Sequence, residues 1–229
     1  MDVTPMDVTP LDVTRGKLII DVPLIDRSTD PVQSDVPAPD PLALAAEWLP
    51  GPDEDRLLMT LTTIDQGGFP RSRTVMLSEF DGESFFFHTD AASEKVADLA
   101  RNPHVSLTVL WPGFTRQLVV QGTAELASPD EIAAAYARRS PYLQQLAWLN
   151  TSDFAALPRA EREARWAAFA VEHPISDQPS GWVGYAVRPH RLLFWVSNPD
   201  AASRRVEYVR AGATGDVDAG EWIRRYLPG

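Results

Sequence analysis

Four side chains between residues 73 and 95 have the chemistry to hold a phosphate group. Arg73 lies in a strand-like stretch, and a guanidinium on a rigid strand can donate two parallel hydrogen bonds to a phosphate. Downstream, Thr89 and Ser93 carry hydroxyl groups, and Lys95 falls at the start of an expected helix, whose N-terminus also attracts anions. If these four groups converge on one point they form a phosphate cradle; the ordinary alternative for a strand arginine is a solvated side chain.

The composition excludes several other kinds of chemistry. The chain has 229 residues, no cysteine, and four histidines without ligand-like spacing, so we expect neither thiolate catalysis nor a metal site. Its formal charge of −11 opposes binding to nucleic acid. No apolar run has the length of a membrane helix, and the N-terminus lacks a signal-peptide pattern. We therefore expect a soluble cytoplasmic protein.

The sequence divides into an N-terminal segment, residues 1–40, and one domain over residues 41–229. Residues 1–14 repeat the unit MDVTP almost three times, and such a short unit rich in Pro and Asp cannot bury a face. We expect the segment to be disordered or extended, although an apolar patch at residues 17–24 could lie across another subunit. Asp40 followed by Pro41 predicts the start of a helix.

The domain is expected to contain about eight short antiparallel strands with helices between them. Runs of β-branched and aromatic residues separated by Gly, Asp and Pro turns predict strands at residues 57–64, 70–80, 84–89, 105–111, 117–126, 205–209 and 221–227. Helical spacing and capping residues predict helices at residues 90–99, 128–139, 142–149 and 158–171. This order argues against a doubly wound parallel sheet and favours a closed or partly closed β-barrel with flanking helices.

The stretch from Gly181 to Arg210 carries the most specific pattern. It reads W-x-G-Y-x3-P-x4-F-W, followed after nine residues by R-x-x-Y, and its two apolar runs around residues 188–190 predict a hairpin. This spacing resembles the C-terminal signature of the pyridoxamine 5′-phosphate oxidase family; the ordinary alternative is a hairpin with core aromatics. The resemblance implies a mainly β fold with flanking helices, an antiparallel Greek-key-like split β-barrel, with FMN as cofactor.

Other motifs extend the resemblance. Residues 73–78 are similar to the family's R-x-V-L-L-K strand, residues 87–89 to F-Y-T, residues 93–95 to S-R-K, and residues 116–117 to an R-Q pair. Two later residues match a Trp and an Arg that face the flavin ring in the family. The cofactor-binding residues that the resemblance implies are Arg73, Thr74, Val75, Met76, Ser78, His88, Thr89, Ser93, Lys95, Gln117, Trp195 and Arg205.

The residues that hold the substrate in the family differ here. Ser78 replaces a Lys, the R-L-H-x-R segment becomes Ala201–Arg205, and the Arg of a helical motif is displaced to Arg139. Glu94 also replaces an Arg beside the expected phosphate site, which could lower the affinity for FMN. The implied substrate-binding residues are Tyr136, Ser78, Arg139 and Ser203. Because a buried phosphate without partners is costly, we expect a substrate other than pyridoxamine phosphate.

Three functions fit these observations. The first is an FMN-dependent oxidase or dehydrogenase that takes a hydride from a small cyclic, aromatic or nitrogen-containing intermediate of secondary metabolism, with oxygen as acceptor. The tail Arg224–Pro228 resembles that of the phenazine-biosynthesis oxidases of the family. No catalytic side chain is identified, and Trp111, Tyr136 and Trp148 could line the pocket.

The alternatives are an altered pyridoxamine 5′-phosphate oxidase and a non-catalytic flavin-binding or ligand-binding protein. By resemblance we also expect a homodimer with FMN at the interface.

Overall fold

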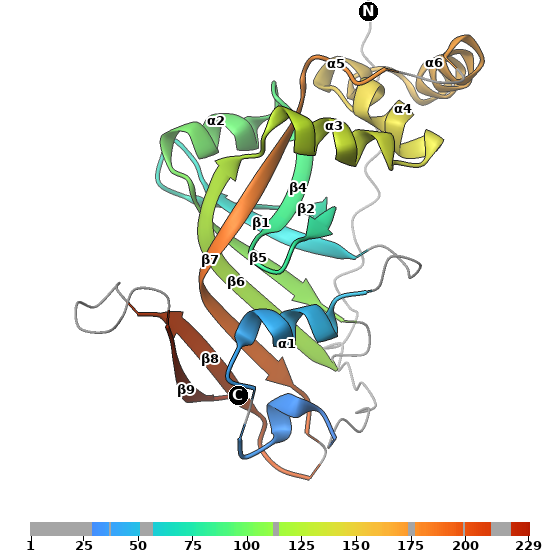
Figure 1. Ribbon diagram of the computed structural model, residues 1–229. Helices are drawn as coiled ribbons and strands as arrows, with labels where there is room; N and C mark the ends of the chain where they lie inside the picture. The colour runs from blue at the N-terminus through green and yellow to red at the C-terminus, as the bar shows by residue number, and fades with distance from the viewer. Residues whose placement is uncertain are drawn as a thin grey trace, which may run out of the picture.

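A computed structural model describes residues 29–36, 38–50, 57–111, 115–173, 177–198, 200–211 and 221–229 (Figure 1). The N-terminal repeat and the apolar patch at residues 17–24 lie outside these ranges. No helix within them is long and apolar enough to cross a membrane. The same residues contain no group of three or more His, Asp or Glu side chains that could hold a metal ion.

Nine strands form one antiparallel sheet that curls into a half-barrel (Figure 1). Its order is β2-β1-β5-β6-β7-β4-β3, and β8 and β9 extend the sheet from β7. The mainly β class predicted from the sequence is therefore confirmed. The strands are β1 (Leu58–Ile64), β2 (Pro70–Met76), β3 (Glu79–Phe80), β4 (Phe85–Asp90), β5 (His104–Leu110), β6 (Arg116–Leu126), β7 (Trp182–Val196), β8 (Arg204–Arg210) and β9 (Trp222–Pro228).

Helices flank the sheet mainly at one end. In Figure 1, α2 to α6 gather at the end where β7 begins, whereas α1 crosses the middle of the sheet. The predicted caps are present: the Asp40 side chain accepts a hydrogen bond from Leu42 N, and Ser128 and Glu131 form a capping box. The helices are the 3₁₀-helix η1 (Pro31–Gln33), α1 (Pro41–Trp48), α2 (Glu94–Arg101), α3 (Pro129–Ala137), α4 (Pro141–Leu149), α5 (Ser152–Ala155) and α6 (Arg159–Glu172).

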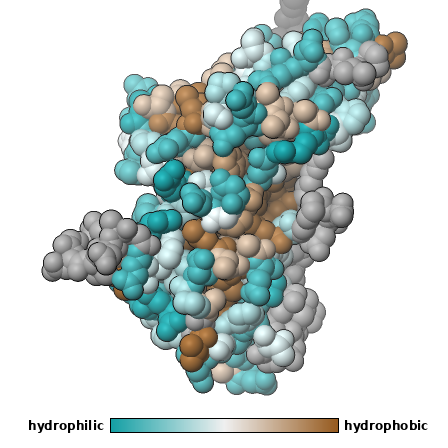
Figure 2. Space-filling view, in the orientation of Figure 1, coloured by the Kyte–Doolittle hydropathy of each residue, from teal (hydrophilic) through white to brown (hydrophobic). Residues whose placement is uncertain are grey.

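The main core lies between α1 and the concave side of the sheet. Leu44 and Trp48 of α1 are buried, and the Trp48 ring meets Phe194 of β7 edge-to-face at 5.0 Å. Figure 2 shows apolar residues gathered in the middle of this view, while the helical end and the lower tip are mostly hydrophilic. The core thus holds β7 against α1.

The segment before α1 packs on the far end of β7. Asp30 is buried and forms an ion pair of 2.5 Å with Arg116, at the start of β6. Gln33 donates a hydrogen bond to the Ser197 carbonyl just after β7. Residues 29–36 therefore lie beside the β6–β7 end of the sheet that carries Gln117 and Trp195.

The predicted hairpin around residues 188–190 is wrong. Trp182–Val196 is one continuous strand, and β6 runs beside it with a register shift between Gln121 and Gly122. On its other side, β7 pairs with β4 as far as Val187 and with β8 from Arg191 onward. Pro189 lies in the gap between these two ladders, where its missing N–H costs no hydrogen bond. A proline that usually marks a turn therefore marks a change of partner strand.

Gly122 allows the close approach of β6 to β7 at this irregularity. A Cβ atom at this position would lie 2.3 Å from the Arg188 carbonyl oxygen, which is a backbone atom and cannot swing aside. We predict that Gly122→Ala lowers the free energy of unfolding by about 2 kcal/mol, measured by urea denaturation with tryptophan fluorescence. Gly181→Ala is the matched control, because its Cβ would meet only Asp90 Oδ1 at 3.4 Å. Equal denaturation midpoints for the two variants would contradict this account.

Candidate functional site

A cavity of about 350 Å³ opens where β2, β4 and the start of α2 meet α4. It brings together eight of the predicted cofactor-binding residues from three separate parts of the sequence: Arg73, Thr74, Val75, Met76, His88, Thr89, Ser93 and Lys95. Arg139, a predicted substrate residue, also lines it. The expected convergence of Arg73 and Lys95 is therefore found in the described structure.

Arg73 is held on β2 by backbone and side-chain partners on β1. Its Nη1 donates hydrogen bonds to the Leu61 carbonyl at 3.3 Å and to Thr63 Oγ1 at 2.7 Å. Burial lowers the pKa of the Arg73 guanidinium, although an arginine side chain stays protonated in proteins. The strand thus presents a fixed cation at the wall of the cavity.

Lys95 reaches the same wall from the first turn of α2. Its Nζ donates to Thr89 Oγ1 at 2.8 Å, and the Ser93 hydroxyl donates to the Asp90 carbonyl at 2.7 Å. Burial and, after it, the nearby charge of Arg73 lower the pKa of the Lys95 ammonium. Two cations thus lie at one wall, where their like charges repel each other, and two hydroxyls and a helix N-terminus lie beside them. This set of groups fits a phosphate dianion.

Glu94 points toward a different partner. It forms an ion pair with Arg71 of β2 at 3.2 Å, and its side chain is 80% exposed. The acidic residue that departs from the family motif is therefore compensated by a strand arginine. It does not line the cavity, so Arg73 and Lys95 keep their positive charge at the wall.

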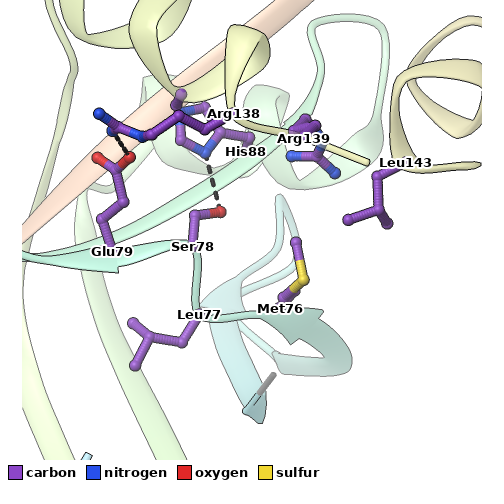
Figure 3. A pocket seen from close by; sticks show the side chains of 9 residues that line it. Met76, Leu77, Ser78, Glu79, His88, Arg138, Arg139 and Leu143 are labelled. Carbon is purple, nitrogen blue, oxygen red and sulfur yellow. Dashed lines mark hydrogen bonds and ion pairs between the residues drawn. The ribbon is translucent and has the colours of Figure 1, made fainter. Parts of the chain in front are cut away.

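A smaller pocket of about 130 Å³ adjoins the cavity beside Ser78 (Figure 3). Ser78 Oγ lies 2.9 Å from His88 Nδ1, and the His88 ring stacks on Trp182 with centroids 4.5 Å apart. Burial first, and then the positive charges of Arg139 and Arg138, lower the pKa of His88 to about 4. His88 is therefore a neutral imidazole at neutral pH.

Two arginines from the end of α3 border this pocket. Figure 3 shows Arg138 paired with Glu79 and Arg139 facing the space above Met76. The Arg139 guanidinium lies over the Trp182 ring, 5.0 Å from its centroid. The pocket thus combines a neutral Ser78–His88 pair with a cation at its rim.

A break in the predicted strand over residues 70–80 creates this corner. β2 ends at Met76, Leu77 N bonds the Leu57 carbonyl, and Ser78 N bonds the Phe86 carbonyl on β4. The chain changes partner from β1 to β4 here because the half-barrel curls at this point. The single predicted strand is therefore wrong, and the break aims Ser78 at His88.

Three of the remaining predicted residues form a second cluster at the other end of β7. Gln117 pairs across the sheet with Trp195, which in turn pairs with Arg205. Trp195 Nε1 donates to Ser203 Oγ at 2.8 Å, so the predicted substrate residue Ser203 joins this cluster. None of these four residues lines either pocket. Arg205 Nε is buried and has no hydrogen-bond partner in the described part of the chain.

The aromatic residues expected to line the pocket point elsewhere. Tyr136 and Trp148 both donate hydrogen bonds to the Asp177 carbonyl, and Trp111 packs edge-to-face on Trp48. The apolar wall comes instead from one face of α4 and from two strand residues, none of which sequence reasoning assigned to the site. These are Leu143, Leu146, Ala147, Leu58 and Trp182. The helical spacing of Leu143, Leu146, Ala147 and Asn150 was the available signal.

Comparisons with known proteins agree with the described fold. The sequence pattern of the family described as "Pyridoxamine 5'-phosphate oxidase" matches residues 52–173. A relative from Streptomyces avermitilis, named pyridoxine/pyridoxamine 5′-phosphate oxidase, is 37% identical over 66% of this chain and 69% of its own length.

Two solved structures share the fold. PhzG from Burkholderia lata, in complex with tetrahydrophenazine-1-carboxylic acid, has a TM-score of 0.71 and 22% identity over 91% of this chain and 99% of its own. A pyridoxamine 5′-phosphate oxidase-related, FMN-binding protein from Nostoc punctiforme has a TM-score of 0.59 and 17% identity over 75% and 87% of the two chains.

The depressed pKa of His88 predicts a pH-dependent contribution to stability. Its pKa is about 4 in the folded chain against an ordinary value of 6.5, so between these values the unfolded chain binds a proton that the folded chain does not. Stability attributable to this group is complete above pH 6.5 and falls as the pH is lowered toward 4. We predict that His88→Gln reduces the loss of unfolding free energy between pH 7 and 4.5 by about 1 to 3 kcal/mol.

The control for this measurement is His104→Gln, which changes an exposed histidine. The loss of unfolding free energy on acidification should be larger in this control than in His88→Gln. If His88→Gln shows the same pH dependence as His104→Gln, His88 is not a neutral buried imidazole.

Proposed function

Because the chain belongs to the pyridoxamine 5′-phosphate oxidase family, we propose that it is an FMN-dependent oxidase or dehydrogenase. Its substrate in this proposal is a small cyclic molecule, aromatic or nitrogen-containing, from secondary metabolism. The substrate gives up a hydride and a proton, and oxygen takes the two electrons as hydrogen peroxide. FMN, when bound, supplies the hydride acceptor that the protein side chains lack.

The cation pair of Arg73 and Lys95 is the observation that carries the proposal. Arg73 has one carboxylate partner, Asp98 at 3.6 Å, and Lys95 donates a hydrogen bond to the neutral hydroxyl of Thr89. A phosphate monoester would satisfy both cations and the hydroxyl of Thr89. Residues 74–76 of β2 continue from this point along the cavity wall, where a flavin ring attached to the phosphate would lie.

The second cluster supports a homodimer in which each site uses two chains. Gln117, Trp195 and Arg205 lie outside the cavity of their own chain, and Arg205 Nε needs a partner. Exposed Leu58 and Leu110 lie on the strands between the cavity and this cluster, 61% and 46% exposed. Burying them against a second copy would remove apolar surface from water and bring the two clusters together. Arg205 would then place a cation at the flavin, which stabilises its reduced form.

The pocket beside Ser78 supports a ring-shaped substrate that is not a phosphate ester. Ser78 and His88 are neutral, and α4 supplies an apolar wall. Arg139 could pair with one carboxylate. The bound molecule of PhzG, a tetrahydrophenazine carboxylic acid, is of this chemical class. His88 and Ser78 would orient the substrate and accept a hydrogen bond from it, because rate here depends on positioning.

An altered pyridoxamine 5′-phosphate oxidase is the second candidate. The position of Arg139 in the cavity favours it, because this arginine could meet a substrate phosphate despite its displacement in the sequence. Release of hydrogen peroxide from pyridoxamine 5′-phosphate, compared with release from reduced nitrogen heterocycles, distinguishes the two. A yellow protein that reacts with neither class would favour the non-catalytic flavin-binding alternative.

We predict that Arg73→Ala and Lys95→Ala each weaken FMN binding about 10- to 100-fold, because each removes one charge-assisted contact to the phosphate. The measurement is a titration of apoprotein with FMN, followed by the absorbance bands between 300 and 550 nm and by quenching of flavin fluorescence. Arg159→Ala is the control, because this arginine is 85% exposed on α6. Wild-type affinity in both cavity variants would rule out the phosphate site.

The two-chain site predicts complementation between inactive variants. In a mixed dimer of Arg73→Ala and Arg205→Ala chains, one site carries both substitutions and the other carries neither. After random exchange of subunits, about a quarter of all sites are intact, so FMN binding should recover to about a quarter of the wild-type level. Mixing the Arg73→Ala and Lys95→Ala chains, whose substitutions fall in one cluster, should restore none. Recovery in neither mixture would contradict the shared site.

A further inference from the structure

Two buried polar side chains lie behind Arg73, outside the cavity. Thr63 on β1 is 0% exposed and Asp98 on α2 is 1% exposed. Neither lines the pockets, so neither can touch a ligand there. Burying a polar group costs free energy unless hydrogen bonds within the protein replace those to water, so both side chains need partners here.

The hydrogen bonds between these residues have a fixed direction. Thr63 Oγ1 lies 2.8 Å from Asp98 Oδ2 and 2.7 Å from Arg73 Nη1. A guanidinium only donates and a carboxylate only accepts, so the Thr63 hydroxyl must donate its proton to Asp98 and accept from Arg73. Donor and acceptor are thus ordered along a chain from Arg73 through Thr63 to Asp98.

Asp98 is itself held by three cations from two elements, Arg101 on its own helix α2 and Arg71 and Arg73 on β2. It accepts a hydrogen bond from Arg101 Nη2 at 2.8 Å, and its Oδ2 lies 3.6 Å from both Arg71 Nη1 and Arg73 Nη2. These contacts compensate the buried carboxylate, whose oxygens accept hydrogen bonds and so fix the direction of the Thr63 hydroxyl.

The hydrogen-bond chain from Arg73 through Thr63 to Asp98, called the relay below, determines which donors of Arg73 remain for a ligand. Nη1 uses both of its protons, on Thr63 and on the Leu61 carbonyl. Within the described residues, Nε and Nη2 of Arg73 make no hydrogen bond. These two nitrogens form one edge of the guanidinium fork, the geometry that meets two oxygens of one phosphate.

We propose that Thr63 and Asp98 are positioning residues that turn this edge of Arg73 toward the cofactor phosphate. The inference rests on the proposed FMN site and deepens it, because it assigns the orientation of the phosphate-binding arginine to a buried hydroxyl and carboxylate. A residue that acts through Arg73 should affect binding of the phosphate and leave binding of the flavin ring unchanged.

The test compares FMN with riboflavin, which has the same ring and no phosphate. Apoprotein variants Thr63→Val, which removes the hydroxyl at nearly constant volume, and Thr63→Ser, which retains it, are titrated with both flavins. We expect Thr63→Val to weaken FMN binding about tenfold, riboflavin binding to stay within about twofold, and Thr63→Ser to keep the wild-type ratio of the two affinities.

A second variant separates positioning from simple charge. Asp98→Asn removes a negative charge near the phosphate, which by Coulomb attraction alone would strengthen FMN binding. The relay predicts that FMN binding weakens relative to riboflavin, because the Thr63 proton loses its fixed acceptor.

The outcomes are distinct. A wild-type FMN-to-riboflavin ratio in Thr63→Val, or tighter FMN binding in Asp98→Asn, overturns the relay while the cofactor site stands. A wild-type protein that binds both flavins equally, or neither, overturns the phosphate site and the relay with it.

Discussion

Strand β7 is the constraint on which the arrangement of the site depends. β6 runs along nearly its whole length, β4 pairs with its first half and β8 with its second half, so the strand cannot bend locally without breaking a ladder. Trp182, at the start of β7, is therefore fixed beside the cavity, and Trp195 lies near the end of the same strand (β7 in Figure 1). One rigid strand separates the two clusters that the proposed cofactor needs. In the proposed homodimer, each copy would supply the end that the other lacks, without any change in the fold.

The sequence predicted the elements of the fold better than their connections. Caps such as Ser128 with Glu131 and alternating strands such as β1 depend on local interactions, and both are present in the structure. The two errors, a hairpin at Pro189 and an unbroken strand through Ser78, have one physical cause. In each case the chain exchanges one neighbouring strand for another, and the new neighbour lies far away in the sequence. Local residue patterns report the conformation of a segment but not the identity of its partners.

The same difference between local and long-range information applies to the candidate site. Arg73 and Lys95, which line the cavity, stand in motifs that resemble those of the family, so the sequence could point to them as candidate cofactor ligands. Thr63 and Asp98 could not be predicted, since a Thr in a strand and an Asp in an amphipathic helix look like ordinary surface-compatible residues until the fold buries both behind Arg73. The residues that support a site are recognised by their burial and by the partners they meet, and neither property is local.

Charge is arranged so that anion binding is local to the cavity. The chain carries a net charge of −11, which on average repels phosphates and carboxylates. Arg71 pairs with Glu94, Asp65 and Asp98, and Arg138 pairs with Glu79. Arg73 shares Asp98 at 3.6 Å, and both Arg73 and Lys95 line the cavity. The neutral His88 and Ser78 occupy the adjoining pocket. This distribution places two cations at one wall of the cavity. In the proposed site, a cofactor phosphate and an uncharged or singly charged ring could therefore bind together. A second phosphate would meet a single arginine there.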